Sequence, residues 1–388
     1  MPVKNRFAEL LPEITAWRQD IHENPELLYE VHRTAAKVAG LLRDFGCDEV
    51  VEGIGRTGVV GVIEGRSDKA GRVIGLRADM DALPIIEQTG AAYASKTPGK
   101  MHACGHDGHT AMLLGAAKYL AETRNFDGTA VVIFQPAEEG GAGGRAMVED
   151  GLMQRFGIQE VYGMHNMPGI PVGTFAIRPG PMMAAADQFD VKVTGKGGHA
   201  AKPHDCIDPV LVSAQIVVGI QSIASRTVDP LKEVVVSVCT VKTESDSYNV
   251  IPQTVTLKGT VRTLDPKVQD LVEARLKALI EGIAAAHGAK AEIDYRRGYP
   301  VTMNTPEETH HAAEVARAIS GGCDMGIAPM MGAEDFSFML NERPGAYIFT
   351  GNGDTAMVHH PAYNFDDNVI PFGASWYAGM VEARMPAG

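Results

Sequence analysis

The sequence of 388 residues lacks any apolar run long enough to cross a bilayer, and its amino terminus carries Lys4 and Arg6 where a signal peptide would become apolar. It also lacks an excess of positive charge, because its formal net charge is −13. Nucleic acids and anionic membrane surfaces bind basic faces of proteins. We therefore expect no secretion signal, no nucleic-acid partner and no membrane partner.

Cysteine is scarce as well. The five cysteines, an odd number, are scattered along the chain at Cys47, Cys104, Cys206, Cys239 and Cys323. This pattern does not form the disulfide framework of a small secreted protein, so it predicts a reducing, cytoplasmic location. A hydrophobic content of 45% and a charged content of 21% are typical of soluble globular proteins, and the length is sufficient for two domains.

Helical and strand patterns alternate in the first part of the chain and again near its end. Apolar periodicity predicts helices over residues 5–23, 34–45, 307–319 and 371–384. Short β-rich runs predict strands over residues 49–51, 59–64, 73–77, 129–135, 161–164 and 346–350. This alternation indicates an α/β domain with a mixed, mainly parallel sheet.

The segment that lies between these two parts of the chain has a different pattern. The expected order is strand, helix, two strands, helix and strand, over residues 188–194, 208–225, 233–242, 254–263, 266–287 and 289–295. The order βαββαβ is that of ferredoxin-like domains. We therefore predict a discontinuous domain of residues 1–186 and 297–388, interrupted by an inserted α+β domain of residues 187–296.

The segment from Met101 to His109, MHACGHDGH, concentrates possible metal ligands. It holds one thiol, three imidazoles and one carboxylate, and it leads into a helix expected over residues 110–120, which Asp107 is expected to cap. Thiolate and imidazole are natural ligands of zinc and similar divalent ions. A cysteine two residues before a histidine is a weak signal by itself, so Cys104 and His106 are explained equally well as a buried thiol beside an ordinary histidine.

Two adjacent carboxylates, Glu138 and Glu139, follow the predicted strand 129–135. Ligands of parallel sheets gather beyond the carboxyl ends of the strands. Adjacent carboxylates repel one another unless solvent or a cation neutralises them. One carboxylate could bind a metal ion while the other acts as a general base. The alternative is a solvated acidic loop, which the flanking glycines and the Gln-Pro pair make less attractive.

Three more histidines could complete a metal site, although each is also explained by a core or surface role. His165 follows the predicted strand 161–164, and His359 and His360 lie in a later loop. The candidate donors are then Cys104, His106, Glu139, His165 and one of His359 and His360. Five donors are too many for one open tetrahedral zinc site, and they fit two ions that share a bridging ligand and a water.

These motifs, in this order, resemble the M20 metallopeptidase and aminoacylase family. Within it they are most similar to hippurate hydrolases, N-acyl-amino-acid amidohydrolases and auxin-conjugate hydrolases. The matching segments are residues 22–26, 77–84, 101–109, 134–140, 163–166, 197–204, 249–252, 332–336 and 359–367. The resemblance covers the whole chain. It implies a catalytic domain interrupted by a smaller domain often used for dimerisation, and hence a homodimer or homotetramer formed through the inserted domain.

The resemblance also implies roles for single residues. The ligands of two divalent ions (Zn, Mn, Co or Ni) would be Cys104, His106, Glu139, His165 and His359, the last because the family's ligand stands two residues before a proline. Glu138 would be the general base. His199, in a glycine-rich turn that could otherwise be a flexible hairpin, would stabilise the carbonyl oxygen, in dimers from the partner chain. Asn249 would hold substrate, and Arg262 is a candidate clamp for its carboxylate; both also have ordinary surface interpretations.

One position departs from the pattern of many family peptidases, which carry a metal-binding His-x-Asp. Here Asp79 takes the place of the histidine and Asp81 follows it. This is usual in the amidohydrolase branch, where the cysteine-containing segment supplies ligands instead. The role of Asp79 as a ligand, as a partner of a ligand, or as support for the loop stays open at this point.

The sequence thus predicts metal-dependent hydrolysis of an N-acyl amino acid, hippurate-like or N-acetylated, to a carboxylic acid and a free amino acid. An N-acetyl-diaminopimelate deacetylase or a dipeptidase on the same scaffold is the alternative. A hydrolase with Cys104 as nucleophile and a non-catalytic binder are disfavoured, because the motifs agree along the whole chain and both Glu138 and His199 are present.

Overall fold

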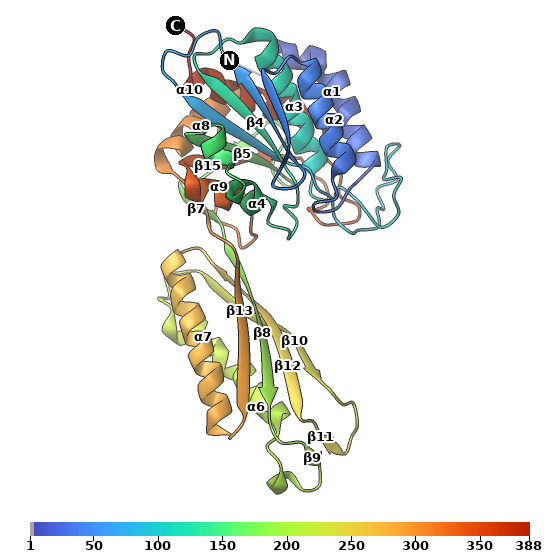
Figure 1. Ribbon diagram of the computed structural model, residues 1–388, viewed down its shortest axis with the longest axis vertical. Coiled ribbons are helices and arrows are strands. Elements are labelled where there is room, and N and C mark those ends of the chain that lie inside the picture. Colours follow the sequence, from blue (N-terminus) through green and yellow to red (C-terminus); the bar gives the residue numbers. More distant parts are fainter. Residues whose placement is uncertain (1–3) are drawn as a thin grey trace. The chain divides into compact units, whose positions relative to one another are not determined.

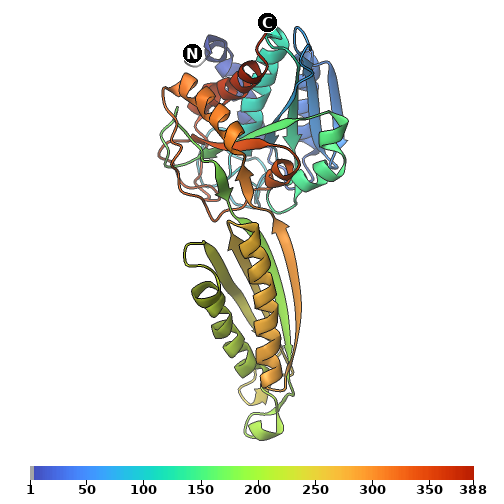
Figure 2. The ribbon, with the colours of Figure 1, turned by 90° about the vertical axis from the view of Figure 1, so that its left-hand side faces the viewer.

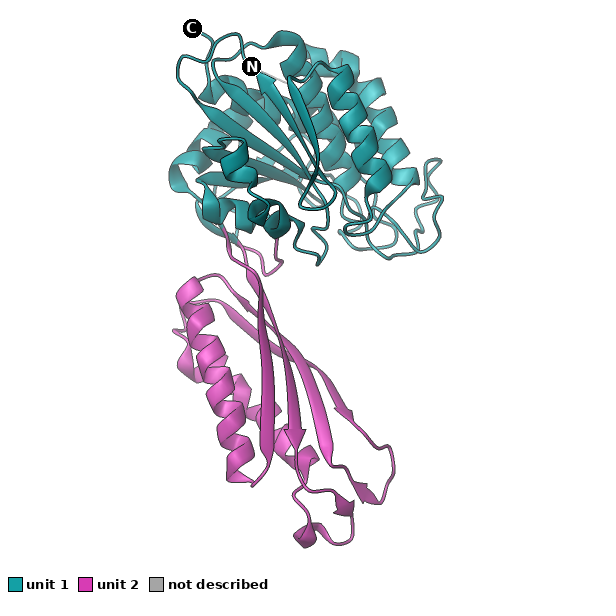
Figure 3. Ribbon diagram, in the orientation of Figure 1, with its two compact units in different colours: residues 1–182, 303–328, 335–388 teal, residues 183–302, 329–334 magenta. Residues whose placement is uncertain are grey.

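The computed structural model describes residues 4–388, and residues 1–3 at the terminus expected to lack a secretion signal lie outside the described part. The contacts divide the chain into two compact units (Figure 3). Unit 1 is Met1–Met182, Met303–Ala328 and Asp335–Gly388, and unit 2 is Met183–Thr302 and Pro329–Glu334. The chain leaves unit 1 through β7 (Gly180–Met183) and returns through β14 (Thr302–Asn304).

A sheet of seven strands forms the centre of unit 1 within residues 4–388, in the order β1-β2-β4-β3-β5-β15-β6. The strands are β1 (Glu49–Ile54), β2 (Gly58–Glu64), β3 (Val73–Asp79), β4 (Thr129–Gln135), β5 (Glu160–Met167), β15 (Gly345–Gly351) and β6 (Phe175–Ala176). The central strands β4, β3, β5 and β15 run parallel, and the outer pairings are antiparallel. The predicted mixed α/β sheet is confirmed. The parallel strands are buried along nearly their whole length because both of their faces are covered.

Helices cover this sheet (Figure 1). They are α1 (Asn5–Glu23), α2 (His32–Asp44), α3 (His106–Thr123), α4 (Gly143–Glu149), α5 (Leu152–Arg155), α8 (Pro306–Ser320), α9 (Ser337–Glu342) and α10 (Ile370–Arg384), with the short turn η3 (Asp367–Val369). Helices α2, α3 and α8 pack on the strands, and α1 and α10 pack on α3. The apolar face predicted for residues 5–23 is buried, with Phe7, Ile14 and Ile21 fully covered. The short helices α4, α5 and α9 are too brief to give a periodic signal, and the sequence did not predict them.

Helix α3 begins at His106, four residues earlier than predicted, so His106 belongs to its first turn. Gly105 precedes the helix at the N-cap position with a left-handed φ of +86°, and no side chain caps the helix there. A Cβ atom there would lie 2.3 Å from Asn166 Nδ2 and 2.4 Å from Tyr363 Oη, so only glycine fits. The prediction that Asp107 caps the helix is wrong, because its carboxylate lies 2.8 Å from the ring of His22 on α1 instead.

Unit 2 has the predicted ferredoxin-like order. It comprises β8 (Ala185–Thr194), α6 (Pro209–Ser222), β10 (Val234–Thr243), β12 (Thr254–Thr263), α7 (Pro266–Ala286) and β13 (Lys290–Tyr299). The strand order is β10-β12-β8-β13, with every pairing antiparallel. Figure 2 shows α6 and α7 along one face of this sheet. Their buried residues, among them Val212, Ile216 and Leu276, form a separate core with the strands. A short ladder joins β9 (Gly198–His199) to β11 (Val250–Ile251), near the turn η1 (Pro203–Asp205).

Helix α6 continues into η2 (Ile223–Thr227), and Pro209–Thr227 has the length and apolarity of a membrane span, with a hydropathy of 1.3. The sequence analysis expected no such run. Only 28% of it is buried, yet Val212, Ile216 and Ile220 on one side belong to the core of unit 2. Because its inner side packs on the sheet of unit 2, we interpret this helix as a core helix with an apolar outer side. Its length and composition alone do not identify it as a membrane span.

Candidate metal centre

The predicted site residues of unit 1 follow neighbouring parallel strands, and they meet at one edge of the sheet. Asp79 ends β3 and pairs in register with Gln135, which ends β4. Glu138 and Glu139 follow after one turn, and His165 lies near the end of β5. The carboxyl ends of parallel strands face the same way, so segments far apart in sequence deliver their polar groups to one place.

The turn that carries the two glutamates has a defined shape. Ala137 adopts a left-handed φ of +55°, which is uncommon outside glycine. The backbone N–H groups of Glu138 and Glu139 donate to the two carboxylate oxygens of Asp81, at 2.9 and 3.1 Å. Asp81 is almost fully buried and therefore fixes the direction of both glutamates. The sequence analysis left Asp81 without a role.

Five of the predicted donors form two overlapping sets. Cys104, His106 and His165 make one, and Cys104, Glu139 and His359 make the other; within each set the ligand atoms lie within 4.8 Å of one another. Cys104 is common to both. Cys104 would therefore be available to either of two ions held by these sets.

The ring of His165 is oriented for such a role. Its Nδ1–H donates a hydrogen bond to the carbonyl oxygen of Asn166, 2.5 Å away, and its Nε2 lies 3.4 Å from Cys104 Sγ. A carbonyl that holds one nitrogen as the donor leaves the other nitrogen with its lone pair toward the site.

The electrostatics of the centre fit a divalent cation. Burial raises the pKa of the Cys104 thiol well above its ordinary value, and the charges of Glu139, Glu138 and Asp79 raise it further. His106 is buried, yet within residues 4–388 neither of its ring nitrogens has a hydrogen-bond partner. Buried imidazoles are rarely left unpaired. Carboxylates, a thiol and an imidazole without a hydrogen bond together have the donor chemistry of a zinc- or manganese-type site.

Both carboxylate oxygens of Asp79 have partners, and its ligand atoms also lie within 4.8 Å of those of His106 and His109. Its Oδ1 lies 2.6 Å from His109 Nδ1, and its Oδ2 accepts from Arg77 at 2.9 Å. Burial alone would raise the pKa of Asp79, but His106, His109 and Arg77 outweigh it and hold the pKa well below the usual value. In turn, His106 lies 3.6 Å from Asp79 Oδ2, and although burial opposes it, Asp79 and Asp81 raise the pKa of His106 to about 10.

The two other histidines of the 101–109 segment lie outside the two sets that share Cys104, although His109 forms a further group with Asp79 and His106. His109 uses both nitrogens, because its Nε2 also accepts the backbone N–H of Asn166 at 2.9 Å. His102 is buried and points toward His22, with the ring centres 6.2 Å apart.

His359 stands on an exposed loop. Its φ is +67°, its side chain is 53% exposed, and its Nε2 lies 3.2 Å from Glu139 Oε1. Its backbone N–H donates to the carbonyl of Ala103 at 2.7 Å, which ties the loop to the cysteine-containing segment. His360 is exposed, and its Nδ1 accepts from the backbone of Ala362 instead. The structure thus brings His359, and not His360, to the other donors.

The remaining candidates belong to unit 2. His199 is exposed on β9 and pairs with Val250, and its Nδ1 accepts the N–H of Ala201 at 3.1 Å. Asn249 precedes Val250 and its carbonyl accepts from Ala200 at 3.0 Å, so His199 and Asn249 share one short ladder. Arg262 lies on β12, where its guanidinium donates to the carbonyl of Val261 at 3.0 Å. Their roles stay predictions.

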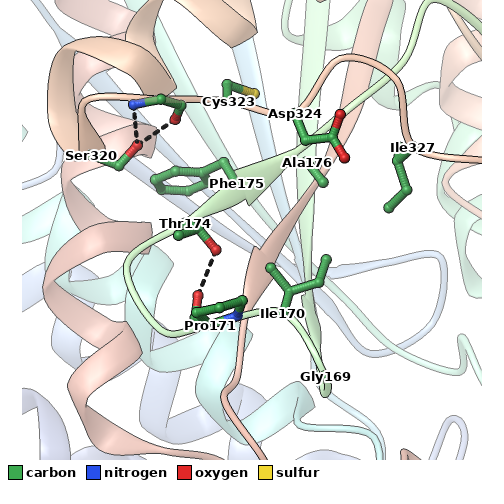
Figure 4. A pocket seen from close by; sticks show the side chains of 11 residues that line it. Gly169, Ile170, Pro171, Thr174, Phe175, Ala176, Ser320, Cys323, Asp324 and Ile327 are labelled. Atoms are coloured by element: carbon green, nitrogen blue, oxygen red, sulfur yellow. Dashed lines mark hydrogen bonds between the residues drawn. The ribbon is translucent and has the colours of Figure 1, made fainter.

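Two hollows in unit 1 contain none of these donors. One, of about 500 Å³, lies against β6, with Phe175 and Ala176 on its wall and Ser320 and Asp324 at its rim (Figure 4). The other, of about 470 Å³, is polar and is lined by residues 352–355 and 364–368 with Tyr93. The site is therefore assigned from donor geometry and not from cavity size.

Known proteins resemble this chain along its whole length. The profile of peptidase family M20/M25/M40 matches residues 75–383. A hippurate hydrolase of Campylobacter jejuni is 43% identical over 95% of this chain and 96% of its own length, and an N-acetylcysteine deacetylase of Bacillus subtilis is 39% identical over 93% and 94%. A solved Bacillus subtilis structure, described as a dinuclear metal binding peptidase from the M20 family, superposes with a TM-score of 0.86 at 34% identity, covering 98% of this chain and 100% of that one.

Proposed function

Since the chain belongs to peptidase family M20/M25/M40 and is an amidohydrolase of its N-acyl amino acid branch, we propose that it removes the acyl group of hippurate-like or N-acetylated amino acids. The observation that supports this most is the pair of donor sets sharing Cys104, with the second carboxylate, Glu138, beside them. His106, Glu138 and Glu139 also have ligand atoms within 4.8 Å of one another. One carboxylate is thus available to bind metal and one to move a proton.

We propose that each subunit binds two divalent cations, which are Zn, Mn, Co or Ni. Their ligands would be Cys104, His106, Glu139, His165 and His359. When bound, such ions acidify a water and polarise the carbonyl of the scissile amide. The dinuclear description of the similar Bacillus subtilis structure supports the number of ions.

The side chains of this protein supply the rest of the proposed reaction. Glu138 takes the proton of the attacking water as the oxygen adds to the amide carbonyl, and then gives it to the leaving nitrogen. His199 donates to the oxygen that becomes negative, a contribution of the kind that accounts for on the order of 100-fold in turnover or more. Asn249 and Arg262 hold the amino acid part of the substrate.

A substrate panel with metal-reconstituted protein tests this function. After chelation, the protein is loaded in separate samples with Mn, Zn, Co or Ni and assayed on benzoyl-glycine, acetyl amino acids, indole-acyl amino acids, N-acetyl-diaminopimelate and unblocked dipeptides. We expect no turnover without metal and the highest kcat/KM on a benzoyl or acetyl amino acid. A preference for N-acetyl-diaminopimelate or for dipeptides would establish the alternative function, and full activity in the chelated protein would exclude a metal-dependent one.

We also propose that unit 2 joins two copies of the chain. Strand β10 is an edge of the four-stranded sheet and packs beside α6. Helix α6 exposes Leu211 (53%) and Val218 (74%), and β10 exposes Val241 (58%). An open edge strand beside apolar side chains invites pairing, and a two-fold dimer covers it with the same surface of a second copy. Val218→Glu should convert a dimer in light scattering to a monomer, and Lys290→Glu on β13, the opposite edge of the sheet, serves as the control for a change of charge. A wild-type monomer at micromolar concentration would exclude this assembly.

A further inference from the structure

A cluster of buried charged residues lies behind the metal centre and has no part in the proposed reaction. It consists of Arg18, His22, Glu87, Asp107 and Asp367, which we call the Arg18 cluster. The side chains of Arg18, His22 and Asp107 are completely buried, that of Glu87 is 6% exposed and that of Asp367 is 25% exposed. Burying so many charges is costly unless each is paired, so the cluster needs a reason in the fold.

Arg18 holds two segments at once. Its Nε and one terminal nitrogen donate to the two oxygens of Asp367 at 2.8 and 2.9 Å, which is the parallel geometry of a strong guanidinium–carboxylate pair. The other terminal nitrogen lies 3.5 Å from Asp107 Oδ2. The guanidinium also stacks 4.2 Å from the ring centre of Tyr93. A lysine could not make this fork, because it presents a single ammonium.

His22, one turn further along α1, extends the cluster. Its Nδ1 lies 2.8 Å from Asp107 Oδ2, and its Nε2 lies 3.3 Å from Glu87 Oε1. The segment that carries Glu87 is joined to the loop after His359, because the N–H of Gln88 donates to the carbonyl of Pro361 at 2.8 Å. Helix α1, the first turn of α3 and the loop after His359 therefore meet at one set of buried charges.

The two carboxylates that Arg18 binds are close in sequence to metal ligands. Asp107 directly follows His106, and Asp367 lies eight residues after His359. His106 is buried and packed, whereas the side chain of His359 is 53% exposed, so packing does not hold it in place. Buried Tyr363 and Phe365 anchor the middle of the His359 loop. The backbone bond to Ala103 fixes the loop at His359, and the Arg18–Asp367 pair fixes its far end.

We propose that Arg18 is a positioning residue of the metal centre, which keeps the exposed ligand His359 in register with the buried ligand segment by binding Asp367 and Asp107 together. The inference rests on the proposed two-ion site. Helix α1 contributes no ligand. Through Arg18 it would nevertheless determine how tightly the ion at His359 is bound. Loss of the pair loosens the far end of the His359 loop and shifts His359, while Cys104, His106 and His165 keep their places.

Metal titration of the full-length protein tests this. The chelated protein is titrated with Mn²⁺ in competition with a chromophoric chelator, which gives the dissociation constants of both equivalents without reference to activity. The variants are Arg18→Met and Asp367→Asn. Asp367→Asn leaves the Arg18–Asp107 contact in place and changes a partly exposed side chain. Its metal affinity can therefore be measured even if Arg18→Met does not fold. The matched control is Arg384→Met, which breaks a paired guanidinium–carboxylate interaction with Glu160, at the opposite, amino end of β5.

In Arg18→Met and Asp367→Asn we expect the dissociation constant of one Mn²⁺ equivalent to rise at least tenfold and that of the other to stay unchanged. In Arg384→Met both constants should stay unchanged. Wild-type constants for both equivalents in Asp367→Asn would overturn the inference, as would an equal loss in Arg384→Met, since the effect would then be one of general stability. If the wild-type protein binds fewer than two equivalents of Mn²⁺, the proposed two-ion function fails, and this inference fails with it. If the wild type binds two equivalents and the variants bind them as tightly, only the inference about Arg18 fails.

Discussion

Asp81 and Glu138 are joined by a hydrogen bond of 2.9 Å from the backbone N–H of Glu138 to the carboxylate of Asp81. The second oxygen of Asp81 accepts from Glu139 at 3.1 Å. One buried carboxylate thus orients the proposed base and a proposed ligand together. A change at Asp81 tests whether this orientation matters.

Asp81→Asn keeps the shape of the side chain but replaces one acceptor oxygen with a donor, which faces a backbone N–H. We expect kcat to fall about 10- to 100-fold, because a hydrogen bond to a charged group contributes about 1.5–3 kcal/mol and about 1.4 kcal/mol is one factor of ten. Steady-state kinetics with saturating Mn²⁺ measures it, with the exposed Asp68→Asn as control. An unchanged kcat would mean that the turn holds the two glutamates without Asp81.

Glu138→Gln separates the proposed base from the ligands. Turnover should fall by about 10²–10⁴, the usual contribution of a general base, while both metal equivalents still bind. Glu139→Gln should have the opposite signature, with weakened metal binding. Kinetics and metal titration of both variants distinguish them, and a Glu138→Gln protein with near-normal kcat would remove Glu138 from the mechanism.

Thiol labelling decides between a ligand and a nucleophile at Cys104. Because burial and nearby carboxylates raise its pKa, Cys104 in the chelated protein should be a neutral thiol and react slowly with iodoacetamide at pH 7. The exposed Cys239 should be alkylated first. We expect the labelled, chelated protein to regain activity when metal is restored. An acyl-enzyme trapped on Cys104 would instead favour the cysteine hydrolase.

The pair of Glu160 and Arg384 predicts a pH dependence of stability. Burial tends to raise the pKa of Glu160, but hydrogen bonds from Arg384 and Tyr162 outweigh it and lower the pKa. A carboxyl whose pKa is lower in the folded state stabilises the protein above its unfolded pKa, about 4.3, and this stabilisation is lost as the pH falls through the folded value.

Arg384→Met removes that stabilisation at neutral pH. Chemical denaturation should therefore show a deficit against wild type that is largest at pH 6–7 and shrinks below about pH 4. The measurement is the free energy of unfolding from urea curves of the chelated protein at a series of pH values. A deficit that does not change with pH would mean that the loss comes from packing of the arginine side chain rather than from its charge.

Much of the fold follows from local sequence. The apolar period of residues 5–23 and the apolar run 130–134 depend only on neighbouring residues, and the helix and the strand that contain them form where they were predicted. The order of elements in unit 2 is likewise visible in the periodicity. The start of α3 was misplaced because the residue before it, Gly105, reads as a loop until Asn166 and Tyr363 are seen to pack on it. The cytoplasmic location rests on composition alone and stays a prediction.

The sequence by itself determined which groups are available for the chemistry: a thiol, imidazoles and paired carboxylates at the ends of strands. The tertiary structure decided which of them meet. That Cys104 belongs to two donor sets, that Asp81 holds the turn of the two glutamates, and that Arg18 binds Asp107 and Asp367 are relations between residues tens to hundreds of positions apart. No local period encodes such pairs, because a buried charge takes whichever partner the packing of distant elements brings within reach.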